Sequence, residues 1–265
     1  MKRIPILLLC LCAWTAWAQL SQEQLYQMLI SASRTYGVGV VPATNWWDYL
    51  ASDCRIYLMD EGTGTNVLDS GTNKAHGSFN AANGATWSDR SGSGGMYFTS
   101  LTSYVSVDGL WADGATSLTI CAWMKARRTD GDIGLAKEVS GSQVICLDRY
   151  VDSSFYAMVR KTPNSYGNTI ASFVDTNWHH IVMVYDAGLE TDALRLKCYV
   201  DGIQQALGFG GLIDTSMFTN SANFRIGYHT TGHPFFEQDG FIDNVIFSLR
   251  AFSSNEQYNI WNATK

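Results

Sequence analysis

Residues 178–202 constrain the fold more than any other stretch of this chain. After Trp178 and two histidines, four consecutive apolar residues of the β-favouring type, 181–184, are typical of a strand that is covered on both faces. Residues 194–200 then alternate apolar and polar side chains with the period of two that a strand requires. Asp201-Gly202 is a two-residue turn in which both positions tolerate positive φ, so a further strand can begin directly after it. The stretch therefore predicts an antiparallel meander.

Candidate strands recur at regular spacing along the rest of the chain, which is the pattern of a β-sandwich. Glycine is plentiful, proline is scarce, and aromatic residues make up 13% of the chain, a composition that favours sheets joined by tight turns. Ser253 and Glu256 have the spacing of a capping box, so we expect a short helical turn near the end of the chain. The predicted strands are residues 55–60, 96–100, 103–107, 117–125, 143–148, 155–160, 178–186, 194–200, 224–229 and 241–248.

These residues resemble a known family. Trp-His-His at 178–180, a strand that ends in Tyr185-Asp186, and Tyr-Val-Asp-Gly at 199–202 are similar to the laminin-G-like jelly roll of the concanavalin A-like lectin/glucanase superfamily. The resemblance covers the chain from residue 52 to its end and implies an all-β fold, a two-sheet antiparallel jelly-roll sandwich. It does not select a function, because this scaffold carries lectins, adhesion modules and glycosidases alike. Further matching segments are 57–64, 69–71, 104–107, 118–123, 225–227 and 239–245.

The first 18 residues have the pattern of an export signal. Lys2 and Arg3 give a positive start, residues 4–14 are mostly apolar, and Ala-Trp-Ala at 16–18 is a small-x-small cleavage site. The apolar run is too short for a comfortable membrane span, and no later segment is long and apolar enough to cross a bilayer. We therefore expect a secreted protein without a membrane span, located outside the cell, on its surface or in a periplasm.

The overall charge argues against two classes of partner. The net charge of the chain is −6, and removal of Lys2 and Arg3 with the signal makes it −8. A mildly acidic protein with no run of basic residues is a poor candidate for binding nucleic acid or an anionic membrane surface. The expected partner is instead a glycan or an extracellular protein ligand, and the sequence leaves the oligomeric state open.

Residues 19–51 lie outside the jelly-roll pattern, so the chain divides into a signal (1–18), an accessory segment (19–51) and the jelly-roll domain (52–265). Ser21 and Gln24 have capping-box spacing, and apolar residues follow at helical spacing, which predicts a short amphipathic helix and then an extended stretch. The interpretation we favour is that this segment packs against the sandwich. The alternative is an assembly or partner-binding segment, because a short isolated helix does not stabilise itself.

Four cysteines remain after the signal: Cys54, Cys121, Cys146 and Cys198. An exported protein meets oxidising conditions, so we expect at least one disulfide in the mature chain. Four thiols allow three pairings, and the sequence does not choose among them. The alternative, that all four are free and buried, also stays open.

The sequence lacks the residue patterns of three common catalytic chemistries. A retaining glycosidase needs two carboxylates about 5 Å apart, which requires acidic residues that alternate along one strand, and no such run occurs. Neither a Gly-x-Ser-x-Gly nucleophile elbow nor a His-Glu-x-x-His metal motif is present. His179 and His180 belong, in the resembling family, to a structural motif. The chain is therefore predicted to be a non-catalytic binding module, with a glycoside hydrolase as the lesser alternative.

Several predicted loops combine aromatic side chains with charged or polar ones, the kind of surface on which sugar rings stack and form hydrogen bonds. Loops carry function on rigid β scaffolds more often than strands do, so we predict glycan recognition at a rim of the sandwich. Ordinary solvated turns are the alternative for each loop, and a structural or adhesive protein–protein role through residues 19–51 is the alternative for the whole chain. The candidate ligand-binding residues are Trp111, Asp148, Tyr150, Arg160, Tyr166, Tyr228, His229 and His233.

Asp243 raises the question of a metal. Period-two counting places it on the same face as Phe241, Val245 and Phe247, a row that should face the core, where an unpaired carboxylate costs several kcal/mol. Many proteins of the resembling family bind calcium at the edge of the sandwich, so the resemblance implies a structural Ca2+ site at Asp243, with further oxygens from the Asp69 loop. The alternative is that backbone amides of this loop bind the carboxylate without a metal.

Overall fold

The computed structural model describes residues 47, 50, 54–90, 94–100, 102–140, 143–161, 165–228 and 238–265. The predicted export signal and nearly all of the accessory segment lie outside the described residues. The strands, in chain order, are β1 (Cys54–Tyr57), β2 (Asn66–Val67), β3 (Gly77–Phe79), β4 (Thr86–Trp87), β5 (Met96–Phe98), β6 (Val105–Val107), β7 (Ser117–Ala126), β8 (Ile133–Ser140), β9 (Gln143–Arg149), β10 (Phe155–Arg160), β11 (Tyr166–Thr169), β12 (His179–Asp186), β13 (Leu196–Val200), β14 (Ile203–Gln205), β15 (Leu207–Gly210), β16 (Phe224–Ile226) and β17 (Gly240–Ser248). The helical elements are the 3-10 turns η2 (Ala81–Asn83) and η3 (Leu110–Ala112) and the α-helices α3 (Asp192–Arg195) and α4 (Ser254–Thr264).

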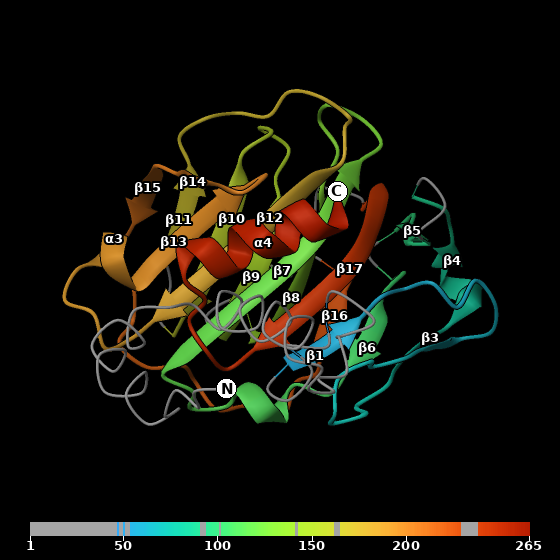
Figure 1. Ribbon diagram of the computed structural model, residues 1–265, viewed down its shortest axis with the longest axis horizontal. Helices are drawn as coiled ribbons and strands as arrows, with labels where there is room; N and C mark the ends of the chain where they lie inside the picture. Colours follow the sequence, from blue (N-terminus) through green and yellow to red (C-terminus); the bar gives the residue numbers. More distant parts are fainter. Residues whose placement is uncertain are drawn as a thin grey trace, which may run out of the picture. The chain divides into compact units, whose positions relative to one another are not determined.

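The described strands form two antiparallel sheets around one core (Figure 1). The first sheet has eight strands in the order β14-β13-β12-β7-β17-β5-β4, with β1 also paired to β17. The second has nine strands in the order β15-β11-β10-β9-β8-β16-β6-β3-β2. The chain passes repeatedly from one sheet to the other, which brings strands that are distant in sequence side by side. This arrangement confirms the predicted all-β jelly-roll sandwich.

The predicted meander is present in the first sheet. β12 lies between β7 and β13, and Ile181 of β12 pairs with Val200 of β13. Asp201 and Gly202 both have positive φ, 49° and 78°, and the chain returns as β14 from Ile203. Both faces of β12 are buried along its apolar run, which explains why the apolar residues are consecutive and do not alternate with polar ones.

The core fills the space between the two sheets and takes alternate residues from the long strands. In β7, Leu118, Ile120 and Ala122 point into it, and Ile145 and Leu147 of β9 do the same from the opposite sheet. All five are fully buried. Each large apolar side chain contributes about 1.5–3 kcal/mol when it is removed from water, so these interleaved rows are the main source of stability. The intervening residues point outward and decide what the two outer faces of the sandwich do.

Helix α4 covers the outer face of the first sheet (Figure 1). The helix begins with the predicted capping box, in which the Ser253 hydroxyl accepts from the Glu256 amide and the Glu256 carboxylate accepts from the Ser253 amide at 2.8 Å. It is longer than the short turn that we expected. Its far end is fixed to the sheet, because Trp123 Nε1 of β7 donates to Thr264 Oγ1 at 2.8 Å. No helix in the described part of the chain has the length and apolar character needed to cross a membrane.

A β-bulge in β17 changes the face on which Asp243 lies. Asn244 has a positive φ of 49°, and the pairing of β17 with β7 shifts register between Asp243 and Ile246. Because one extra residue is inserted here, Ile242 shares the core face with Val245. The prediction that Asp243 faces the core is therefore wrong. The residue lies on the outer face of the sheet, where it is nevertheless fully buried.

All four cysteines are buried and none of them forms a disulfide, so the predicted disulfide is not present among them. Strand β17 lies between Cys54 of β1 and Cys121 of β7. Two strand spacings amount to about 9.5 Å, beyond the roughly 7 Å that the Cα atoms of a disulfide allow. Cys146 packs on the outer face of the second sheet, whereas Cys198 lies in the core. Burial raises the pKa of the Cys198 thiol to about 12, so it stays protonated and unreactive.

Candidate functional site

Five tyrosines gather on the outer face of the second sheet. In β10, Phe155 and Ala157 point into the core, so the alternation of the strand turns Tyr156 outward. The outward side chains pack on a small apolar cluster that includes Val144 and Met158. We call this surface the tyrosine face and define it by Tyr104, Tyr150, Tyr156, Tyr166 and Tyr228.

Three of these tyrosines form a continuous group around β10 and β11. The ring of Tyr156 lies 5.0 Å from the ring of Tyr150 and 5.5 Å from that of Tyr166. All three are half-buried, so each ring is held by its neighbours and still presents a surface to solvent. Burial, with a smaller contribution from the charge of Asp152, raises the pKa of Tyr156 to about 12. Its hydroxyl therefore remains a hydrogen-bond donor at neutral pH.

The other two tyrosines form a second group around Arg225. The rings of Tyr104 and Tyr228 meet edge to face, with their centroids 5.9 Å apart. The guanidinium carbon of Arg225 lies 4.9 Å from the ring centre of Tyr104 and 4.6 Å from that of Tyr228. A guanidinium stacked against two rings restricts their motion and keeps a positive charge at the surface. The second group is therefore also fixed in place before any ligand binds.

Charged side chains lie among the tyrosines. Asp148 is fully buried and accepts a hydrogen bond from the Cys146 thiol at 2.9 Å. Burial, and then the charge of Asp148, raise the pKa of Cys146 well above its usual value, so this sulfur is no nucleophile. Arg160 is half-buried, and its guanidinium lies 3.3 Å from the Met158 sulfur. The face thus combines aromatic rings with a few fixed polar groups, as binding sites for small ligands do.

The structure places most of the predicted ligand-binding residues on this one face, though not all of them. Trp111 lies elsewhere: its ring stacks on Phe224 with centroids 5.9 Å apart and packs against the core. His229 and His233 lie outside the described residues. The predicted residues that the tyrosine face brings together are Asp148, Tyr150, Arg160, Tyr166 and Tyr228.

Three residues of the face are not among the predicted candidates. Tyr156 could have been found, because residues 155–160 are predicted as a strand and alternate side chains of a half-buried strand face outward. The same alternation turns Tyr104 and Arg225 outward, because both lie in predicted strands, but their contact with each other depends on the pairing of β6 with β16 and has no local signal. The site also lies mainly on strands, whereas the sequence predicts loops at a rim of the sandwich.

His179 and His180 stabilise the meander. His179 lies between two carboxylates, with Nδ1 2.7 Å from Asp201 and Nε2 3.0 Å from Asp175. Burial opposes the charged form of His179, but these two hydrogen bonds prevail and raise its pKa. The backbone amide of His180 also donates to Asp201, at 2.9 Å. Asp201 therefore links the turn to the start of β12. This contact explains why the two histidines and the Asp-Gly turn occur together in the sequence pattern.

N–H donors hold the two carboxylates that are predicted to bind calcium. Asp69 accepts hydrogen bonds from the backbone amides of Ile56, Gly71 and Ala75 at 2.9, 2.8 and 3.0 Å. Asp243 pairs with Arg90, whose Nε lies 2.5 Å from Oδ2 of the aspartate. The sequence predicts either calcium or backbone amides of the Asp69 loop as the partner of Asp243, and Arg90 is neither. Within the described residues, no group of three or more His, Cys, Asp or Glu side chains could hold a metal. Calcium stays a prediction, but these contacts fit the metal-free account better, since a guanidinium beside a carboxylate opposes a bound cation.

Comparison with known proteins identifies a family whose model matches this chain and several solved structures with a similar fold. A family model for the concanavalin A-like lectin/glucanases superfamily matches residues 98–256, which contain most strands of both sheets. Comparison with the curated proteins gives no match.

Solved structures with a similar fold belong to longer chains. They include botulinum neurotoxin type C, which depends on interaction with two ganglioside molecules to enter cells (TM-score 0.60, 10% identity, 81% of this chain and 51% of that chain). The binding domain of Paraclostridial Mosquitocidal Protein 1 is another (TM-score 0.60, 13% identity, 80% of this chain and 52% of that chain). A third is a sialidase of Trypanosoma rangeli (TM-score 0.54, 16% identity, 78% of this chain and 32% of that chain). This chain spans about a third to a half of their length, and at such identities the likeness is one of fold alone.

Proposed function

Because this chain belongs to the concanavalin A-like lectin/glucanase superfamily, we propose that it is a secreted, non-catalytic module that binds carbohydrate on its tyrosine face. One observation carries the proposal: five tyrosines, each fixed by an aromatic neighbour, lie on one outer face of a rigid sheet. Botulinum neurotoxin type C, whose fold is similar, interacts with gangliosides, and this supports a sugar-containing ligand for the present chain.

Half-exposed tyrosines suit sugar rings for a physical reason. One face of a pyranose carries mainly C–H groups, which pack on an aromatic ring and remove apolar area from water. The hydroxyl groups at its edge then exchange hydrogen bonds with water for hydrogen bonds with tyrosine hydroxyls and nearby charged groups. Tyr156 is already packed between Tyr150 and Tyr166, so little side-chain entropy is lost on binding.

A glycan array of the intact mature protein tests the proposal, followed by affinity measurements on the glycans that bind. Tyr156→Ala and Tyr166→Ala each remove one stacking ring, and we expect each to weaken binding about 3- to 10-fold, the equivalent of one aromatic contact. Tyr258→Ala is the matched control, because this tyrosine is 47% exposed but lies on α4, away from the tyrosine face.

Two results would contradict the proposal. One is a wild-type protein that binds no glycan on the array, in protein whose unfolding transition shows that it is folded. The other is equal loss of affinity in Tyr156→Ala and Tyr258→Ala, which would place the ligand elsewhere or make the effect non-specific.

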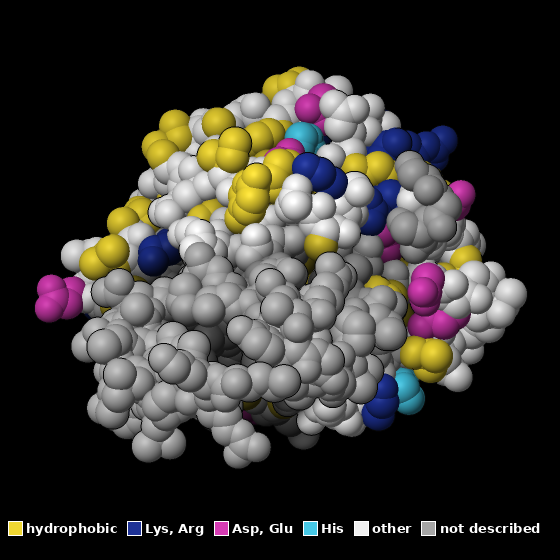
Figure 2. Space-filling model, in the orientation of Figure 1, with side chains coloured by type: hydrophobic (Ala, Val, Ile, Leu, Met, Phe, Trp, Pro, Cys, Tyr) yellow, Lys and Arg dark blue, Asp and Glu magenta, His cyan; other side chains and the backbone are white. Residues whose placement is uncertain are grey.

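A protein–protein role is the second candidate, and exposed apolar side chains at one end of the sandwich favour it. Ile203 of β14 is 66% exposed, and Leu212 is 79% exposed. Figure 2 shows hydrophobic side chains gathered over the part of the molecule where β14 and β15 lie. These are edge strands of the two described sheets, and edge strands can accept a strand from a partner. Loss of a native oligomer on deletion of residues 19–51 would favour this role, whereas a monomer that keeps its glycan affinity would favour the first proposal.

A further inference from the structure

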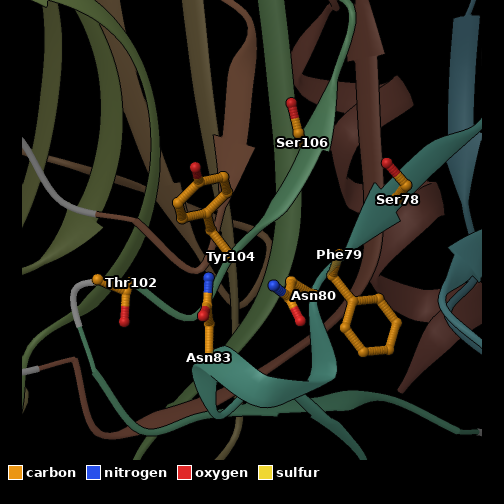
Figure 3. A pocket seen from close by; sticks show the side chains of 7 residues that line it. All are labelled: Ser78, Phe79, Asn80, Asn83, Thr102, Tyr104 and Ser106. Atoms are coloured by element: carbon orange, nitrogen blue, oxygen red, sulfur yellow. The ribbon is translucent and has the colours of Figure 1, made fainter.

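A pocket of about 280 Å³ lies beside the tyrosine face, over the paired strands β3 and β6 and next to η2 (Figure 3). Tyr104 belongs to both, because its ring is part of the tyrosine face and also lines the pocket. Phe79, at the edge of the pocket, packs edge to face on Trp87 in the core. The side chains that supply the polar groups are Ser78, Asn80, Asn83, Thr102, Tyr104 and Ser106.

The polar groups of this pocket are all uncharged and include free donors and acceptors. The side-chain carbonyl of Asn80 accepts the Ala82 amide at 3.0 Å, which leaves its NH2 group for a ligand. The side-chain polar atoms of Ser78, Asn83 and Tyr104 form no hydrogen bond with any residue that the structure describes. Hydroxyl and amide groups of this kind match the hydroxyl groups of a neutral sugar.

The backbone that carries these groups is fixed by its own hydrogen bonds. Asn80 caps η2, and the Ser103 hydroxyl accepts the amides of Thr99 and Ser100, each at 2.9 Å. The Ser100 hydroxyl in turn donates to the carbonyl of Asn83 at 3.2 Å, which joins Ser100 to η2. A pocket that is organised before binding loses less entropy when the ligand enters.

We propose that this pocket is a subsite for one neutral sugar ring, the terminal ring of a glycan whose next rings lie on the tyrosine face. The inference rests on the proposed function and adds the chemical class of the terminal sugar. The pocket is smaller than the roughly 300–1,000 Å³ of sites for drug-sized ligands, so it suits a single ring. None of its lining side chains is charged. Arg225 lies outside the lining, and its guanidinium is stacked on the rings of Tyr104 and Tyr228. A carboxylate or sulfate would therefore exchange water for uncharged hydroxyl and amide groups, without an ion pair from the lining.

Isothermal titration of the intact mature protein with matched oligosaccharides tests the subsite. The probes are a glycan that binds on the array with a terminal hexose, and the same glycan with the corresponding uronic acid as its terminal ring. We expect the hexose form to bind at least tenfold more tightly. Asn83→Ala should weaken binding of the hexose form about 3- to 10-fold, the effect of one lost hydrogen bond to a ligand. Asn262→Ala, an exposed asparagine on α4, is the matched control and should have no effect.

The outcomes separate this inference from the proposed function. Equal affinity for the two terminal rings would overturn the neutral subsite, as would wild-type affinity in Asn83→Ala while Tyr156→Ala still weakens binding; in both cases carbohydrate binding on the tyrosine face stands. A folded wild type that binds no glycan overturns both. Because Asn83 is exposed, Asn83→Ala should keep the wild-type melting temperature, so a loss of affinity will not reflect unfolding.

Discussion

The same strand alternation produces the two outer faces of the sandwich, but their outward side chains differ in exposure to solvent. On the first sheet, the outward residues Trp123, His180 and Asp243 are almost inaccessible to solvent, because the last helix of the chain packs over this face. On the second sheet, the outward residues Tyr156 and Tyr166 stay half-buried. An outward polar or aromatic side chain therefore has no fixed meaning in a β-sandwich: it is structural where a later segment covers the face and available for ligands where the rings stay accessible.

Arg90 is the centre of the covered face. Its guanidinium pairs with Asp243, donates to the Thr264 carbonyl at 2.9 Å and lies 4.6 Å from the ring centre of Trp123. The Asp243 carboxylate also accepts the amide of Asn244 at 2.8 Å. Buried charges are tolerated only when they are paired and hydrogen-bonded, and here one ion pair joins β17, β7 and the end of α4.

The largest expected effect comes from breaking this ion pair. Arg90→Met keeps an apolar stem over Trp123 but leaves the Asp243 carboxylate without its cation, so we expect a loss of about 3–5 kcal/mol in the free energy of unfolding. Urea denaturation measures it. Arg128→Met, which removes an exposed guanidinium, is the control and should change stability by no more than about 0.5 kcal/mol. Equal effects of the two substitutions would show that the covered face does not depend on Arg90.

The neighbouring histidines should give opposite pH dependences of stability. Burial, against the opposing charge of Asp201, lowers the pKa of His180 to about 3, whereas the pKa of His179 is raised. Below the ordinary histidine pKa of about 6.5, the unfolded chain binds a proton at His180 that the folded chain excludes. The free energy of unfolding therefore decreases as the pH is lowered, by up to about 1.4 kcal/mol per pH unit. The contribution of His179 is complete below about 6.5 and is lost as pH rises through its folded pKa.

Urea unfolding across the pH range separates the two histidines. We expect His180→Gln to flatten the acid side of the stability profile between about pH 3 and 6.5, and His179→Gln to flatten the side above about 6.5. The slopes are the test, because both substitutions also lower stability overall. If each variant keeps the wild-type slopes, then neither histidine titrates as its contacts in the meander require.

A smaller effect on stability is expected on the tyrosine face. Tyr156→Ala removes a half-buried ring from a surface, so we expect it to lower the free energy of unfolding by about 1–2 kcal/mol, less than a core truncation. Tyr185→Ala is the comparison, because Tyr185 is fully buried in the core and should cost about 3–5 kcal/mol, as aromatic truncations in cores do. Equal losses would mean that the tyrosine face is packed like the core and is not a surface for ligands.

The smallest expected effect is that of a chelator. Backbone amides hold Asp69 and Arg90 holds Asp243, so removal of divalent cations should leave the melting temperature of the wild type unchanged. A lower melting temperature in chelator, restored by added calcium and not seen in Asp243→Asn, would instead support the calcium site that the family resemblance implies.

Much of the fold is encoded in local patterns that the sequence displays. The apolar run of β12, the Asp201-Gly202 turn and the Ser253 capping box each involve residues close in sequence, and each is present as predicted. At Asp243, the assignment of faces from alternate residues fails. One residue with positive φ, Asn244, shifts the alternation of β17, and nothing in a period of two announces a bulge.

The candidate site was predictable only in part, for a related reason. Tyr150 and Tyr166 stand out as aromatic residues beside charged ones, and they lie on the tyrosine face. Trp111 has the same local character but packs against the core, because the pairing of the strands, and not the local sequence, decides its surroundings. Tyr104 and Arg225 meet only because β6 and β16 are neighbours in the second sheet, although they are far apart in the chain.

Hydrogen exchange of the intact mature protein, with and without the tightest-binding glycan of an array, tests the contrast between the two faces most directly. We expect the glycan to slow exchange in residues 104–107, 155–160 and 166–169, on and around the tyrosine face, and to leave residues 254–264 of α4 unchanged. Protection of α4 or of the β14 and β15 edges, with none on the tyrosine face, would contradict it. So would a folded protein for which no glycan on the array produces any protection.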